Sequence, residues 1–228
     1  IGEDSFTYTI SDGAGGTSTA TVNVAVGLLA AGPWPMMGRD AAHTGYYPGT
    51  LNGQTLSLGW SLQVSPQPLN QVSIAEGKVF ATPDIYFNET QLSAVDLATG
   101  TLAWKKVWPV QARSLNGPAF HSSTVYVQRG NHSSDSQLWA LNTADGSTPW
   151  STPFSAQWGR YLPPTVTDDA VYVNGGYYGG IYGYNRSTGS QLFFASLDQY
   201  DSWTPTFYNG NPYSYVAGKL RQHHPTTG

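Results

Sequence analysis

The sequence predicts an all-β protein, and three observations support this fold class. First, the 228 residues include 26 glycines and 15 prolines. Second, 14% of the residues are aromatic and only 11% are charged, a composition that suits many short strands joined by tight turns. Third, apolar and polar residues alternate in several segments, whereas no segment shows a sustained helical periodicity with caps at both ends.

Charge and composition exclude several functional classes. The net charge is −4 and no run of Lys or Arg occurs, so we expect no nucleic-acid partner. No apolar run approaches the roughly 20 residues that a membrane-spanning helix needs, so we expect no membrane span. The absence of cysteine excludes disulfides, thiolate metal sites and cysteine nucleophiles within this chain. Because the chain starts at Ile1 inside an expected strand, we expect a mature product or a fragment.

Residues 1–26 form a strongly predicted β-hairpin. The segment 5–11 (SFTYTIS) places Phe6, Tyr8 and Ile10 on one face, and the segment 17–26 (TSTATVNVAV) alternates in the same way. Between them, the glycine-rich sequence DGAGG favours a tight turn. A two-stranded hairpin is marginally stable alone in water, so further strands are expected to cover its apolar face.

The pattern D-x-F-x-Y-x-x-x-D-G, followed by alternating Thr and Val, resembles the closing strands of bacterial cadherin-like or immunoglobulin-like surface repeats. The resemblance covers residues 2–26 and leaves two alternatives. The hairpin is either the end of a truncated β-sandwich domain, or a donated element that completes the sandwich of another chain by strand addition. Related repeats often bind calcium, which makes Asp4 and Asp12 candidate calcium ligands. Asp12 also fits a simple role as a turn residue before Gly13.

Residues 27–57 are interpreted as a linker followed by an opening motif. Gly27, Gly32, Pro33 and Pro35 break the strand pattern. The next segment resembles the motif W-P-x-x-x-x-D-x-x-x-T-G-x-x-P that opens many pyrroloquinoline-quinone-like propellers. The matching residues are Trp34, Pro35, Asp40, Thr44, Gly45 and Pro48. In that family the segment is structural and leads into the first blade, so no catalytic role is expected for His43.

Internal repetition is the strongest signal in the chain. The segments 93–104, 139–150 and 182–193 align with one another, and their turn glycines recur at intervals of 46 and 43 residues. An aromatic residue follows each glycine four positions later. The glycine–aromatic pairs are Gly100 with Trp104, Gly146 with Trp150, and Gly189 with Phe193.

Each repeat contains three or four short strands in about 45 residues, which is the size of one propeller blade. Because one blade cannot bury both of its apolar faces, blades must stack against each other. We therefore predict a partial β-propeller in which about four blades begin. The predicted blades are 58–106, 107–152, 153–196 and 197–228, the last being incomplete because it stops before any turn glycine.

The pattern A-x-D-x-x-T-G-x-x-x-W, at Ala94 to Trp104, is identified as the docking motif of quinoprotein-like propellers. In such proteins the Trp is expected to lie at the junction between blades, where it covers much apolar area. The resembled propellers have seven or eight blades, so the chain is expected to be incomplete or to close against something else. Some relatives bind a quinone together with calcium, but this chain has no clustered Glu, Asn and Asp set. We therefore expect no cofactor, with calcium as the single open question.

Three segments that precede equivalent strands, 112–117, 158–164 and 200–206, are expected to converge on one face of the propeller. They contribute aromatic and charged side chains of the kinds that bind sugars. The candidate ligand-binding residues are Arg113, Trp158, Arg160, Tyr161 and Trp203. The alternative is that these aromatic side chains fill the core between blades.

No pair of carboxylates has a spacing that indicates glycosidase chemistry. The favoured function is therefore a non-enzymatic extracellular or cell-surface scaffold or adhesion protein, which self-assembles through strand addition by the hairpin. Its expected partners are other protein chains, including further copies of itself in a homo-polymer, or surface glycans. The alternatives are a carbohydrate-binding or carbohydrate-acting propeller and a quinone-dependent oxidoreductase. Family analogy carries most of this functional prediction.

Overall fold

The computed structural model describes residues 2–26, 33–47, 57–84, 90–108, 114–130, 136–156, 162–175, 178–200 and 202–228. The chain divides into two compact units, and each is described by itself. One unit contains Ile1–Gly32 and Pro48–Gln54, and the other contains Pro33–Tyr47 and Thr55–Gly228. Every regular element in the described residues is a strand, which confirms the predicted all-β class. Within these residues no helix could cross a membrane.

The first unit contains the predicted hairpin. Strands β1 (Gly2–Ser11) and β2 (Thr17–Val26) pair antiparallel over their whole length. The apolar side chains Phe6, Tyr8 and Ile10 are each at least half exposed to solvent. The hairpin thus presents an apolar face that no other described residue covers.

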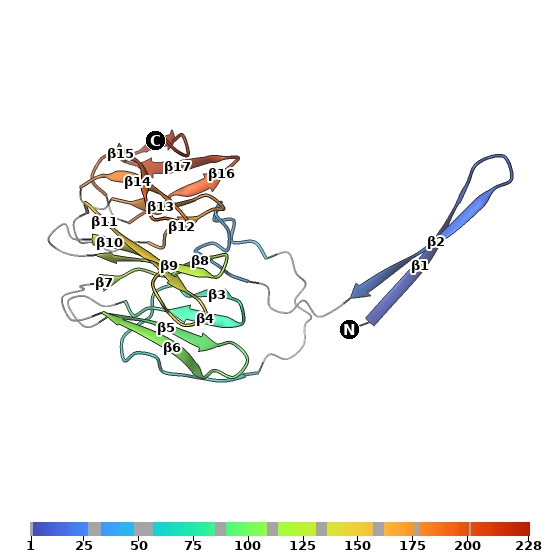
Figure 1. Ribbon diagram of the computed structural model, residues 1–228, viewed down its shortest axis with the longest axis horizontal. Coiled ribbons are helices and arrows are strands. Elements are labelled where there is room, and N and C mark those ends of the chain that lie inside the picture. The colour runs from blue at the N-terminus through green and yellow to red at the C-terminus, as the bar shows by residue number, and fades with distance from the viewer. Residues whose placement is uncertain are drawn as a thin grey trace. The chain divides into compact units, whose positions relative to one another are not determined.

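The second unit contains four sheets that follow one another along the chain (Figure 1). The first sheet consists of β3 (Ser73–Ala75), β4 (Lys78–Ala81), β5 (Thr90–Asp96) and β6 (Leu102–Trp108). The second consists of β7 (Ser114–Leu115), β8 (Ala119–His121), β9 (Thr124–Gly130), β10 (Ser136–Asn142) and β11 (Trp150–Phe154). The third consists of β12 (Thr165–Val166), β13 (Ala170–Asn174), β14 (Gly180–Asn185) and β15 (Gln191–Ser196). The fourth consists of β16 (Thr206–Tyr208), β17 (Asn211–Val216) and β18 (Lys219–Gln222).

These sheets are stacked face to face in sequence order, with the first and the fourth at opposite ends (Figure 1). A hydrophobic cluster fills each of the three spaces between consecutive sheets. The inner sheets are therefore covered on both faces, which explains why every residue of β13, with the sequence AVYVN, is buried. Strands covered on both faces read as continuous apolar runs rather than as strict alternation. The arrangement is that of consecutive blades of a partial β-propeller.

The opening segment 33–47 contacts the first, second and fourth sheets through backbone hydrogen bonds. Trp34 exchanges two of these bonds with Ile74 in the first sheet. The N–H of Phe120 in the second sheet donates to Pro35 O, and the N–H of Phe207 in the fourth donates to Ala41 O. The segment thus does more than lead into the first blade, because it ties the inner edges of the stack together.

Candidate functional site

An aromatic side chain from one sheet covers a glycine of the next. Trp104 of β6 lies over the turn of the second sheet, where a Cβ added to Gly146 would be 2.7 Å from the indole ring. Gly146 has a φ of +71°, which favours glycine. The Trp104 Nε1–H donates to Thr143 O at 2.8 Å and fixes the ring in place. Trp150 covers Gly189 of the third sheet in the same way.

The structure contains two further pairs of an aromatic ring and a covered glycine that the sequence analysis did not identify. Trp60 covers Gly100, and its Nε1–H donates to Leu97 O at 2.9 Å. At the other end of the stack, Phe193 lies 2.7 Å from the position of a Cβ on Gly228. The fourth repeat therefore does contain its turn glycine, contrary to the prediction that it stops before one. The sequence contains a signal for each of these pairs. Trp60 precedes Trp104 by 44 residues, which is close to the repeat interval, and Gly228 ends the sequence T-T-G, like the T-G of Gly100.

His43 of the opening segment is held in place by hydrogen bonds to other parts of the fold. Its Nδ1 lies 2.6 Å from Met37 O, and its Nε2 lies 2.9 Å from Thr165 Oγ1 and 2.8 Å from Pro205 O. Both ring nitrogens are therefore occupied by hydrogen bonds. The imidazole connects the opening segment to the third sheet and to the segment before β16, and it offers no free nitrogen for acid–base chemistry.

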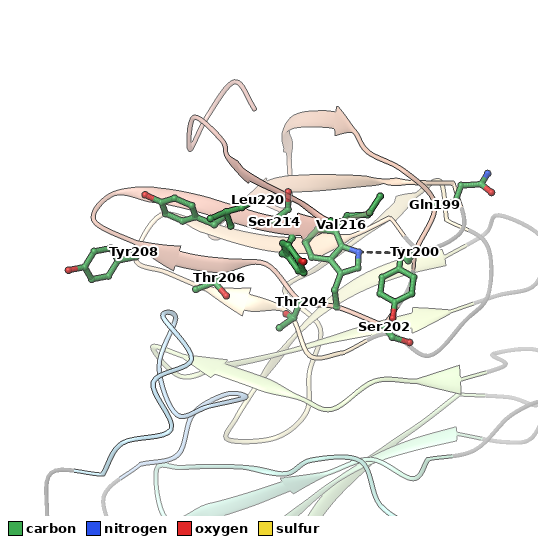
Figure 2. Close-up of a pocket in the computed structure, with 14 residues that line it drawn as sticks. Gln199, Tyr200, Ser202, Thr204, Thr206, Tyr208, Ser214, Val216 and Leu220 are labelled. Carbon is green, nitrogen blue, oxygen red and sulfur yellow. Dashed lines mark hydrogen bonds between the residues drawn. The ribbon is translucent and has the colours of Figure 1, made fainter.

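The outward face of the fourth sheet carries a groove of about 1000 Å³. Aromatic and aliphatic side chains dominate its lining, including Tyr200, Trp203, Tyr208, Tyr215 and Leu220. Figure 2 shows Tyr208 and Tyr200 toward opposite ends of the groove, with Leu220 and Val216 between them. The groove is thus an elongated apolar surface rather than a closed polar pocket.

Trp203 is the one predicted ligand-binding residue whose position is described. It lines the groove but is mostly buried in the core between the third and fourth sheets. Its Nε1–H donates to Tyr200 O at 3.0 Å (Figure 2). The other four predicted residues, Arg113, Trp158, Arg160 and Tyr161, lie outside the described residues. Their convergence with Trp203 on one face remains a prediction.

An aromatic residue in the second strand of each of the first three sheets shows that the groove lies on a face of the kind that a following sheet covers. Phe80 in β4, Tyr126 in β9 and Tyr172 in β13 occupy matching positions and are 0%, 1% and 1% exposed. Each faces the following sheet, and burial there raises the pKa of Tyr172 to about 12. In β17 the matching residue is Tyr213, which is only partly buried, and Tyr215, two residues further along the same strand face, is 66% exposed. The face of the fourth sheet therefore has the side chains of a sheet-stacking surface without a described sheet upon it.

The candidate calcium ligands are only partly described. Asp12 Oδ1 accepts hydrogen bonds from the backbone N–H groups of Ala14 and Gly16, both at 2.8 Å. These bonds hold the pKa of Asp12 below its usual range and give it a role in the turn. The side chain of Asp4 lies outside the described side chains. Within the described part of the chain, no group of three or more His, Asp or Glu residues could hold a metal ion, so calcium remains a prediction.

Family models match both units of the chain. A family of PQQ-type repeats, described as outer membrane protein assembly factor BamB, matches residues 49–159 and 88–206. A bacterial Ig domain family matches residues 1–25. A search of curated proteins found no match.

Solved structures resemble the stack of sheets. The quinohemoprotein alcohol dehydrogenase ADHIIG from Pseudomonas putida HK5 is 21% identical with a TM-score of 0.57, over 72% of this chain and 26% of its own. BamB from Moraxella catarrhalis is 21% identical with a TM-score of 0.51, over 70% and 48%. The computationally designed Ika4 protein is 13% identical with a TM-score of 0.58, over 75% and 99%. The chain thus spans about a quarter of the dehydrogenase and about half of BamB, and these likenesses show the propeller fold alone.

Proposed function

This chain belongs to the family of PQQ-type propeller repeats described as outer membrane protein assembly factor BamB, and we propose that it is a non-enzymatic scaffold protein of the bacterial cell surface or extracellular space. In this proposal the propeller blades and the Ig-type hairpin provide surfaces for other protein chains. Neither surface requires a cofactor. Quinoprotein dehydrogenases share the fold, but fold alone does not transfer their chemistry to this chain.

The observation that carries the proposal is the exposed apolar face of the hairpin. Phe6, Tyr8 and Ile10 line up on this face and contact no further strand in the described residues. Full burial of one such side chain contributes about 1.5–3 kcal/mol, so covering three of them favours association strongly. We propose that the hairpin is donated to the open edge of an Ig-type sheet in another copy, as in strand addition. Adhesion or filament assembly would follow from repeated donation.

The assembly state of the purified chain tests this proposal. Light scattering and negative-stain microscopy should reveal polymers of the full chain that disappear when residues 1–26 are deleted. Ile10→Lys should also abolish the polymers, because it places a charge on the apolar face. Thr7→Lys is the matched control, since it changes an exposed residue of the opposite face. Equal assembly states for the full chain and the deletion would contradict assembly through the hairpin.

Localisation is tested separately. An extracellular or surface position predicts that an antibody against the chain labels intact cells of the source organism. It also predicts that protease added to intact cells degrades the chain. Labelling that requires permeabilised cells would contradict the proposed location.

A second candidate function is carbohydrate binding in the groove of the fourth sheet. The observation that favours it is the row of aromatic side chains, since flat rings cover the apolar faces of sugars. A glycan array should then show binding that Tyr208→Ala weakens. Tyr208 suits this test because its side chain is exposed and its loss leaves the core intact. Absence of binding to every glycan would remove this candidate.

Oxidoreductase activity is the remaining alternative. We propose that the chain binds no quinone, and reconstitution with pyrroloquinoline quinone and calcium tests this directly. The expected result is that no quinone absorbance stays with the protein after desalting. Retained absorbance would require the non-enzymatic proposal to be withdrawn.

A further inference from the structure

The junction between the first and second sheets holds a positive charge against an aromatic ring. Trp108 of β6 packs edge-on against Trp139 of β10, with ring centroids 5.4 Å apart and an interplanar angle of 78°. The Lys106 Nζ lies over the Trp139 ring, 5.7 Å from its centroid. An ammonium at this distance is attracted by the electron-rich face of the indole. This junction therefore provides its own cation for its aromatic pair.

The junction between the second and third sheets repeats this aromatic pair. Phe154 of β11 follows Trp108 by 46 residues, and Tyr182 of β14 follows Trp139 by 43 residues. These are the same intervals that separate the turn glycines, so the two pairs occupy matching positions. Phe154 and Tyr182 also meet edge-on, with ring centroids 5.6 Å apart and an angle of 63°. The aromatic part of the first junction is therefore present in the second.

The lysine is not repeated. Thr152 of β11 has the position of Lys106, since each lies opposite a fully buried leucine of the neighbouring strand, Leu138 and Leu92 respectively. The side chain of Thr152 is short and uncharged, so it cannot supply the cation that Lys106 supplies. The second junction therefore has the rings of the first without the ammonium group that lies on them.

A hollow of about 720 Å³ borders the aromatic pair of the second junction. Two further rings line it, Tyr178 and Phe194 of β15, and the centroid of Phe194 lies 4.6 Å from that of Tyr182. Phe154 and Tyr182 are almost fully buried, whereas Phe194 and Tyr178 are 43% and 49% exposed. The last two rings are therefore the ones that a ligand can reach. None of the residues described in the lining carries a charge.

We propose that this hollow binds a small molecule with a quaternary ammonium group, which takes the place that the Lys106 ammonium has in the preceding junction. The four rings of the lining match a group that is positively charged but apolar at its surface. A primary ammonium is strongly hydrated and needs acceptors in place of its water, and the described lining contains no carboxylate. A quaternary ammonium has no N–H to satisfy. Consecutive sheets of one chain form both walls, so a single copy is sufficient.

Two probes that differ only in charge provide the first test. Choline and dimethylbutanol have nearly the same shape, because a carbon atom in the second replaces the nitrogen of the first. Titration of the full chain, followed by NMR of the probe, should show that choline binds with a dissociation constant on the order of 1 mM. Dimethylbutanol should bind about 10-fold more weakly. Equal affinities would overturn the proposal, because the hollow would then recognise apolar shape alone.

Variants of the second junction locate the binding site. Thr152→Lys restores the missing lysine and should abolish choline binding, because the new ammonium takes the place of the ligand. Ser151→Lys is the matched control, since it adds the same charge one residue away on the other face of β11, and it should bind choline like the wild type.

Phe194→Ser removes one of the two exposed rings and should weaken choline binding roughly 2- to 30-fold. Urea denaturation of each variant shows whether it is folded. The proposal is overturned if the wild type binds no choline, if Thr152→Lys or Phe194→Ser leaves binding unchanged, or if Ser151→Lys abolishes it as well.

Discussion

Replacement of Gly146 by Ala tests the contact that joins neighbouring sheets. Gly146 has a φ of +71°, and an added Cβ would lie 2.7 Å from Cε3 of Trp104. The indole cannot simply move away, because its Nε1–H is bonded to Thr143 O. The substitution therefore combines two costs, a backbone cost at positive φ and a steric cost between sheets.

The two costs can be separated with a glycine of the same backbone conformation. Gly218 also has a φ of +71°, but nothing lies within 4 Å of the position that a Cβ would take there. Ala in the left-handed region costs about 1–2 kcal/mol, part of which is offset by the lower entropy of the unfolded chain. Overfilling a well-filled contact costs about 1–3 kcal/mol more. Gly218→Ala should therefore lose about 1 kcal/mol and Gly146→Ala about 2–4 kcal/mol.

Urea denaturation followed by tryptophan fluorescence measures both losses, with each free energy of unfolding obtained by linear extrapolation. The quantity of interest is the difference between the two variants. Equal losses for Gly146→Ala and Gly218→Ala would refute the reasoning, because they would mean that the contact with Trp104 adds nothing to the backbone cost.

Three further predictions concern other parts of the stack. Burial holds the pKa of His223 below its usual 6.5, so the fold favours the neutral imidazole. The free energy of unfolding should therefore fall as the pH drops below about 6.5. The urea midpoint of the wild type should decrease between pH values of about 7.5 and about 5.5, and this decrease should be smaller in His223→Gln. Trp60→Phe removes the hydrogen bond to Leu97 O and should cost about 1 kcal/mol in urea denaturation, whereas an unchanged midpoint would show that the bond contributes nothing. His43→Ala removes the links of the opening segment to Thr165 and Pro205, so limited proteolysis should cut residues 33–47 faster than in the wild type, and equal rates would contradict this role.

Much of the fold was predictable because its signals are local. Alternation and the DGAGG turn predicted the hairpin, and the strand pairing in β1 and β2 follows it closely. The interval between Gly100 and Gly146 predicted the repeating sheets, since a turn that needs positive φ selects glycine each time. The family models and the solved structures agree with this interpretation.

The candidate site was less predictable because its contacts cross between distant segments. Trp60 stands apart from the aligned repeats, and its role depends on a hydrogen bond to a residue 37 positions away. His43 contacts Pro205 across 162 positions, which no local pattern indicates. Trp203 was identified as a surface candidate, yet most of its ring lies in the core between two sheets.

The sequence by itself determined the strands, their turns and the repeat that generates one sheet after another, because period-two alternation and positive-φ glycines act over a few residues. Only the tertiary structure decided which faces of these similar sheets are covered. Tyr126, Tyr172 and Tyr213 have the same place in the strand pairing, but the first two are buried and the third is only partly buried. Burial depends on the sheet that lies against each face, and that neighbour is set by stacking rather than by the residues around the tyrosine.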